Sequence, residues 1–173
     1  GKWGQSQRKV VTDRRLREVV EECVDLPGYE VFKYFDEEGE VKDVKSRDLS
    51  VYVKEVMGDE FTPKDFRTWA GTLIAAVQLA GLGPVTESKR AEKNVLAAVD
   101  AVAERLGNTR DIARSSYISP RVIDHYLEGS MVAYSGEHLE EVIAAEQNNL
   151  TEGEKELLKL LNKKLRRELR EAA

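Results

Sequence analysis

No stretch of the chain limits the possible folds more than residues 62–83. Thr62-Pro63 is a helix-start signal, and Gly81 and Gly83-Pro84 end the apolar pattern that follows it. The interior of the stretch is rich in alanine and leucine, which is typical of a helix buried on most of its sides. The sequence therefore predicts a long central core helix, whose larger apolar residues are Phe66, Trp69, Leu73, Ile74, Val77 and Leu79.

Shorter helices are predicted on either side of it. Capping residues at their ends and apolar residues three and four positions apart place them at about residues 13–26, 46–57, 86–106, 109–116, 120–127, 137–145 and 151–169. In the helix that Ser46 is expected to cap, Leu49, Val53 and Val56 should face inward. The last helix has one apolar face, formed by Leu157, Leu158, Leu161, Leu165 and Leu169. This face is expected to dock on its own domain, and a contact between molecules is the alternative.

Strand-like segments are confined to the N-terminal side. Residues 7–12 are predicted to form a short strand, and residues 30–36 and 41–44 to form a hairpin around the acidic turn 37–40. The 173 residues are therefore expected to form one mainly α domain with small β-hairpins near its N-terminus.

Charge and composition narrow the class of protein. The formal net charge of −5 argues, taken whole, against a nucleic-acid partner, but basic residues are concentrated in segments 1–20 and 105–124, which fits a local phosphate-binding face. A single cysteine and the lack of an apolar run of about 20 residues predict a soluble protein of a reducing compartment, here cytoplasmic, with no membrane partner.

His125 and His138 have no cysteine nearby, which argues against a zinc site, and His125 is expected on a helix surface.

Residues 108–120 place one tyrosine among groups suited to holding a phosphate. Tyr117 follows a short helical run opened by Asn108 or Thr109 and precedes a new helix start at Ser119-Pro120. Guanidinium groups match phosphate oxygens in geometry and charge, and three of them flank the tyrosine, those of Arg110, Arg114 and Arg121. These residues alone leave two interpretations open: a tyrosine packed at a helix junction, or a nucleophile held beside a phosphate.

Three ordered motifs resemble those of type IB DNA topoisomerases of the bacterial and poxvirus kind. Segment 62–72, Thr-Pro-Lys-Asp-Phe-Arg-Thr-Trp-Ala-Gly-Thr, is similar to the one that carries a catalytic arginine in that family. Asn108-Thr109 and segment 114–120, Arg-Ser-Ser-Tyr-Ile-Ser-Pro, match in order and spacing, and Gly1-Lys2-Trp3-Gly4 resembles the turn that carries the family's catalytic lysine. The resemblance covers nearly the whole chain and implies the helical catalytic domain that the family shares with tyrosine recombinases.

The resemblance implies relaxation of supercoiled duplex DNA, without metal, ATP or another cofactor, through a transient 3′-phosphotyrosyl link. Tyr117 would be the nucleophile, and because a phenol ionises only near about pH 10, it needs cations beside it. Arg67 and Asn108 would stabilise the transition state, although Asn108 stands where other branches use histidine and its amide cannot shuttle a proton. Lys2 would protonate the departing 5′ oxygen. The implied contacts with the DNA backbone are Lys64, Arg110, Arg114 and Arg121.

The sequence departs from the family pattern on its N-terminal side. The family's site uses a further arginine upstream of the lysine and a clamp domain that closes around DNA, and residues 1–173 include neither. We therefore expect these residues to be the bulk of a monomeric catalytic domain that alone relaxes DNA weakly or not at all. Two alternatives stay open: a tyrosine recombinase, which would usually have histidine in place of Lys64, and a noncatalytic DNA-binding module of the same fold.

Overall fold

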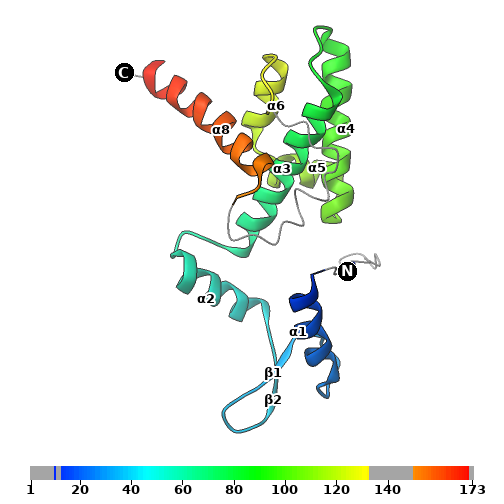
Figure 1. The fold of residues 1–173 in the computed structure, drawn as a ribbon, viewed down its shortest axis with the longest axis vertical. Helices are drawn as coiled ribbons and strands as arrows, with labels where there is room; N and C mark the ends of the chain where they lie inside the picture. The colour runs from blue at the N-terminus through cyan, green and yellow to red at the C-terminus, as the bar shows by residue number, and fades with distance from the viewer. Residues whose placement is uncertain (1–9, 11–12, 133–149, 172–173) are drawn as a thin grey trace. The chain divides into compact units, whose positions relative to one another are not determined.

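The computed structural model describes residues 10, 13–132 and 150–171 (Figure 1). Over these residues the fold is mainly helical, with seven helices and one two-stranded antiparallel hairpin, which confirms the predicted fold class. The chain forms two compact units, Gly1–Pro63 and Lys64–Ala173. The predicted helix 137–145 lies outside the described residues, and so does the predicted strand 7–12 apart from Val10.

The first unit contains helix α1 (Arg14–Asp25), which begins where its cap was predicted. The Asp13 carboxylate accepts a hydrogen bond from the backbone N–H of Leu16 at 2.7 Å, which satisfies one of the free amides of the first turn. Beyond the end of the helix, the buried ammonium group of Lys33 donates to the carbonyl oxygens of Leu26, at 2.5 Å, and Gly28, at 3.3 Å. A lysine of the hairpin therefore holds the turn that follows α1.

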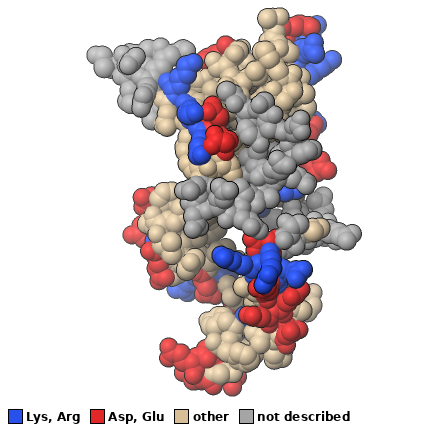
Figure 2. Space-filling view, viewed as in Figure 1, with Lys and Arg blue, Asp and Glu red and all other residues tan. Residues whose placement is uncertain are grey.

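The hairpin is shorter than the sequence predicted. Strand β1 (Lys33–Phe35) pairs antiparallel with β2 (Val41–Asp43), and the expected strand 30–36 is limited to three residues. At one end the Asp36 carboxylate accepts the N–H groups of Glu38 and Glu40 and shapes the turn, while the Asp36 N–H still donates to the carbonyl oxygen of Glu40 at 2.9 Å. At the other end a single backbone hydrogen bond, from the N–H of Val44 to the carbonyl oxygen of Phe32, extends the pairing beyond the three-residue strands. The acidic side chains of this turn form the red group at the lower end of Figure 2.

Helix α2 (Ser46–Met57) differs from its prediction at its start and on its inward face. Lys45, rather than Ser46, is the cap residue, and its N–H donates to the Asp48 carboxylate at 2.8 Å. Of the three residues expected to face inward, only Val53 is buried, whereas the side chains of Leu49 and Val56 are 48% and 64% exposed. The structure confirms the prediction for Val53 alone, because a spacing rule does not say how much of an apolar face finds a partner.

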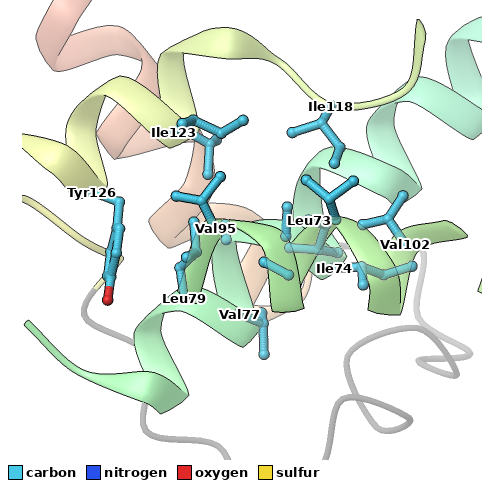
Figure 3. Packing of buried hydrophobic residues seen from close by; sticks show 14 of the residues in the cluster. Leu73, Ile74, Val77, Leu79, Val95, Val102, Ile118, Ile123 and Tyr126 are labelled. Atoms are coloured by element: carbon cyan, nitrogen blue, oxygen red, sulfur yellow. The ribbon is translucent and has the colours of Figure 1, made fainter. Parts of the chain in front are cut away.

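The second unit is a helical bundle around α3 (Pro63–Leu82). It also contains α4 (Ser88–Leu106, two residues later than predicted), α5 (Arg110–Ser116), α6 (Pro120–Leu127) and α8 (Glu152–Glu171). Figure 3 shows side chains of α3 and α4 converging with Ile118 and Ile123 on one interior. The middle of α3 is buried on most sides, which confirms its role as the core helix, and its buried residues are Gly71, Thr72, Leu73, Ile74, Ala75, Ala76, Val77 and Leu79.

Two details of this bundle bear on the sequence predictions. Helix α8 docks on its own unit as expected, since it contacts α6 and buries the predicted Leu157, and it also buries Leu160, which was not predicted. The side chains of Leu165 and Leu169 lie outside the described residues. His125 was expected on a helix surface, and this was wrong, since it is only 4% exposed. The eight-residue helix α6 is packed against both α4 and α8, so more of its circumference is covered than a single apolar stripe would suggest. Among the described residues, none of the helices is both long and apolar enough to span a bilayer.

Candidate active site

Two cationic residues lie near the start of α3. Pro63 opens the helix with its φ angle already suited to the first turn, and Lys64 and Arg67 follow on the exposed part before the core begins. The Arg67 guanidinium donates a hydrogen bond through Nη2 to the carbonyl oxygen of Leu106 at 3.0 Å. Arg67 is therefore oriented by the end of a different helix, α4.

The same carbonyl oxygen accepts a second hydrogen bond. Helix α4 ends at Leu106 because Gly107 adopts a left-handed conformation with φ of 66°. The chain then turns so that the amide nitrogen Nδ2 of Asn108 lies 3.1 Å from the oxygen of Leu106. Arg67 and Asn108, which are far apart in the sequence, are thus brought to one acceptor.

Tyr117 lies at the corner between α5 and α6. Thr109 caps α5 through its hydroxyl, the Tyr117 N–H closes the last turn on the oxygen of Ala113 at 3.1 Å, and Pro120 begins the next helix. The side chain is half-buried, with the Arg67 guanidinium carbon 4.8 Å from its ring centroid and the Lys64 ammonium 6.0 Å from it. Both distances allow a cation–π interaction.

The structure therefore brings Tyr117, Arg67, Asn108 and Lys64 together from three separate segments. This arrangement provides a nucleophilic oxygen, a fork of guanidinium donors, an amide donor and a second cation in one place. Such a set suits a reaction at a phosphodiester, where extra negative charge develops on the nonbridging oxygens. Within the described residues, no group of three or more His, Cys, Asp or Glu side chains is placed to hold a metal ion.

The other predicted DNA contacts lie in different surroundings. The Arg110 guanidinium donates to both carboxylate oxygens of Asp100 on α4, at 2.5 and 2.7 Å. This hydrogen-bonded pair lowers the pKa of the Asp100 carboxyl and raises that of Arg110. Arg114 is exposed in the last turn of α5, and Arg121 is half-buried in the first turn of α6. Lys2 lies outside the described residues.

Comparison with known proteins identifies the family. Residues 5–138 match the sequence family described as eukaryotic DNA topoisomerase I, catalytic core. The chain belongs to this family. DNA topoisomerase 1B of Acanthamoeba polyphaga mimivirus is 30% identical to it over 133 residues, which make up 73% of this chain and 40% of that protein. The chain thus spans less than half the length of this relative, and the predicted type IB resemblance is confirmed.

In this topoisomerase catalytic core, two features of the site were missed by the sequence reasoning. The first is the Leu106 carbonyl, which cannot be inferred from side-chain types because any residue could supply it. The second is the face of α3 just after Arg67, where Thr68, Gly71 and Thr72 contact the tyrosine corner. Their spacing of three and four residues places them on one helix face, and small residues on such a face are a sequence signal for close backbone approach.

A third missed contact joins α3 to α8 of the topoisomerase core. The indole N–H of Trp69 donates to the Glu154 carboxylate at 2.8 Å, and the other oxygen of that carboxylate accepts from both the N–H and the hydroxyl of Thr151. Burial acts to raise the pKa of the Glu154 carboxyl, but these hydrogen bonds from Trp69 and Thr151 outweigh it, so that the pKa lies below its usual value. Trp69 was predicted to be a core residue, and it does pack against the core.

Proposed function

We propose that this chain cuts and reseals one strand of duplex DNA through Tyr117 and thereby relaxes supercoils. The phenolic oxygen attacks phosphorus, the bond from phosphorus to the 5′ oxygen breaks, and a 3′-phosphotyrosyl link forms. The phenolic proton leaves, and the 5′ oxygen takes up a proton to become a hydroxyl group. Resealing is the reverse reaction, and because the covalent link keeps the bond energy, no nucleotide has to be hydrolysed.

The observation that carries the proposal is the placement of the Arg67 guanidinium 4.8 Å from the Tyr117 ring centroid while it is hydrogen-bonded to the carbonyl that also holds Asn108. A guanidinium fixed in this way can bridge the nucleophile and a nonbridging phosphate oxygen without reorganising during the reaction. Lys64 adds a second positive charge near the same ring, which favours an approaching phosphodiester.

We assign the remaining roles as follows. Asn108 donates its amide hydrogens to a nonbridging oxygen, and Lys2 is the general acid that protonates the 5′ oxygen. Arg114 and Arg121 contact backbone phosphates, and Arg110 does so while it is held by Asp100.

A covalent-capture experiment tests the proposal. The protein is incubated with a nicked duplex whose cleaved end diffuses away, so that even a slow enzyme accumulates the protein–DNA adduct. Tyr117→Phe should abolish the adduct, whereas Tyr29→Phe, at a tyrosine that is 99% exposed, should leave it unchanged. An adduct that persists in Tyr117→Phe would overturn the assignment. If neither the unmodified protein nor either variant forms an adduct, the result would favour a noncatalytic DNA-binding module.

Two further variants separate the roles. Arg67→Ala should slow adduct formation by a factor on the order of 100 to 1,000. Lys2→Ala should slow it by a factor of roughly 100 or more on ordinary DNA, but not on DNA whose leaving oxygen is replaced by sulfur, since a thiolate leaves without being protonated. Equal losses on both substrates would contradict the general-acid role of Lys2.

A further inference from the structure

One face of α3 supports the corner that carries Tyr117, and we call the residues Thr68, Gly71 and Thr72 the α3 seat. The hydroxyl of Thr68 lies 3.3 Å from the carbonyl oxygen of Ser116 and 3.2 Å from that of Lys64, so its hydrogen can serve either acceptor. The hydroxyl of Thr72 accepts the N–H of Ser119 at 3.1 Å and reaches the carbonyl oxygen of Tyr117 at 3.5 Å. The corner is therefore held on both sides of the tyrosine.

Gly71 lies between the two threonines, and its lack of a side chain permits the contact. A Cβ atom at this position would overlap the carbonyl oxygen of Tyr117 and would lie 3.1 Å from its Cβ and 3.2 Å from its carbonyl carbon. These atoms belong to the backbone and the base of the side chain, so they cannot move away without moving the tyrosine ring. Glycine inside a helix is unfavourable compared with alanine, and the close approach of the corner gives a reason for it here.

The seat and the catalytic arginine belong to the same rigid element. Gly71 follows Arg67 by four residues, which places both on one face of α3. The spacing of neighbouring turns in a helix varies very little, so Arg67 and Gly71 keep a fixed distance from each other. The closeness of the Tyr117 backbone to Gly71 therefore determines the distance between the Tyr117 ring and the Arg67 guanidinium. Thr72 is buried, with 3% of its surface exposed, so water does not compete for its hydroxyl.

We propose that Thr68, Gly71 and Thr72 are positioning residues that set the nucleophile against Arg67. They touch the backbone of the corner rather than the DNA. The catalytic consequence rests on the function proposed above, whereas the structural consequence, a fixed distance from the ring to the guanidinium, does not. A substitution at the seat should therefore slow covalent chemistry without weakening DNA binding.

Alanine at two glycines of the same helix gives a matched test. Gly71→Ala should slow single-turnover adduct formation at saturating DNA by a factor on the order of 100, since a misplacement of about 1 Å has that effect on an aligned reaction. Gly81→Ala introduces the same methyl group on α3 at a site where its Cβ would meet no atom within 4 Å apart from its chain neighbours and the helix's own backbone, and its rate should equal that of the unmodified protein. The DNA dissociation constants, measured with Tyr117→Phe in each background, should agree within about twofold.

Substitutions at Thr72 provide a test that does not enlarge the side chain. Thr72→Val removes the hydroxyl and leaves the N–H of Ser119 without its acceptor, and the adduct should form roughly tenfold more slowly. Thr72→Ser keeps the hydroxyl and should restore most of the rate. If valine and serine behave alike, the hydroxyl does not position the corner. This pair also decides the matter if Gly71→Ala proves too unstable to purify.

A spectroscopic readout makes the test independent of catalysis. Fluorotyrosine incorporated at position 117 should give a ¹⁹F resonance that moves when Arg67→Ala removes the guanidinium beside the ring. Gly71→Ala should move the resonance as well, and Gly81→Ala should not. If the unmodified protein forms no adduct, the proposed function fails and the resonance still tests the seat. If Gly71→Ala leaves both the resonance and the adduct rate unchanged, the positioning role is overturned.

Discussion

The two compact units of this chain are stabilised in different ways. In the second unit, helices α3, α4, α6 and α8 contribute to one buried apolar cluster. In the first unit, Val53 is the single buried hydrophobic residue among those the structure describes there. What organises the first unit instead is local: the cap of α1, the short hairpin and the ammonium group of Lys33. The residues that converge on Tyr117 all belong to the unit with a continuous core, which can hold a geometry to within an ångström.

The strongest test of this contrast truncates one apolar side chain to alanine in each unit. Ile74→Ala removes a side chain that is 1% exposed, so it should lower the free energy of unfolding of the second unit by about 3 kcal/mol. Leu49→Ala, at a residue 48% exposed in the first unit, should cost about 0.5 kcal/mol. Urea unfolding followed by circular dichroism measures both. Equal losses would mean that the first unit has a core after all.

The second test asks whether a polar contact stabilises the first unit, as apolar packing stabilises the second. Lys33→Met keeps the length of the side chain but leaves the carbonyl oxygens of Leu26 and Gly28 without their buried donor, at a cost of about 2 kcal/mol. Amide hydrogen exchange in α1 should speed up accordingly. Lys54→Met, at an exposed lysine of α2, is the control and should leave the exchange rates of α1 unaltered.

A smaller effect is expected where α8 joins α3 in the second unit. Trp69→Phe keeps the packing of an aromatic ring but removes the indole N–H that binds Glu154, which should cost about 1 kcal/mol. Hydrogen exchange should accelerate at residues 151–156 and stay unchanged in α4. Unaltered exchange at residues 151–156 in Trp69→Phe would show that the indole hydrogen bond does not hold the start of α8.

The smallest effect concerns the surface pair of Arg110 and Asp100. Hydrogen bonding to Arg110 lowers the pKa of the Asp100 carboxyl in the folded state. The ionised carboxylate therefore stabilises the fold fully at pH values above the pKa of an unfolded aspartate, about 3.9. This contribution is lost as the pH falls through the lower pKa of the folded state. Asp100→Asn should therefore lower the melting temperature slightly at neutral pH and not at all at low pH. Arg110→Gln should show the same pH profile, and a difference that persists in acid would rule out the pair as its source.

The sequence predicted those features that depend on a few neighbouring residues. The helix starts at Asp13 and Pro120 and the end of α4 at Gly107 are confirmed, and of the two candidates Asn108 and Thr109 the structure has Thr109 as the cap. These signals can be recognised in the sequence because caps, prolines and left-handed glycines act within about one helical turn. The motifs around Arg67 and Tyr117 gave the family for a similar reason, since each is a short run of characteristic residues. Their convergence in space supports what the motifs implied.

The features that the sequence did not predict depend on which faces meet. The exposure of Leu49 and the burial of His125 are decided by neighbouring elements distant in the chain, and helical spacing contains no such information. The pairing of Arg110 with Asp100 and the contact of Gly71 with Tyr117 likewise join different helices. Arg110 was predicted to contact a phosphate, but in the structure its guanidinium is hydrogen-bonded to the carboxylate of Asp100.

The oxygen shared by Arg67 and Asn108 has an evolutionary consequence, because it belongs to the main chain. Every amino acid brings that acceptor, so exchanges at position 106 are limited by the packing of the side chain against the apolar core and not by the chemistry of the site. Position 107 is limited by its backbone instead, since a φ of 66° disfavours residues that have a Cβ atom, most of all the β-branched ones. A saturation library should consequently accept other apolar residues at position 106 and should strongly favour glycine at position 107.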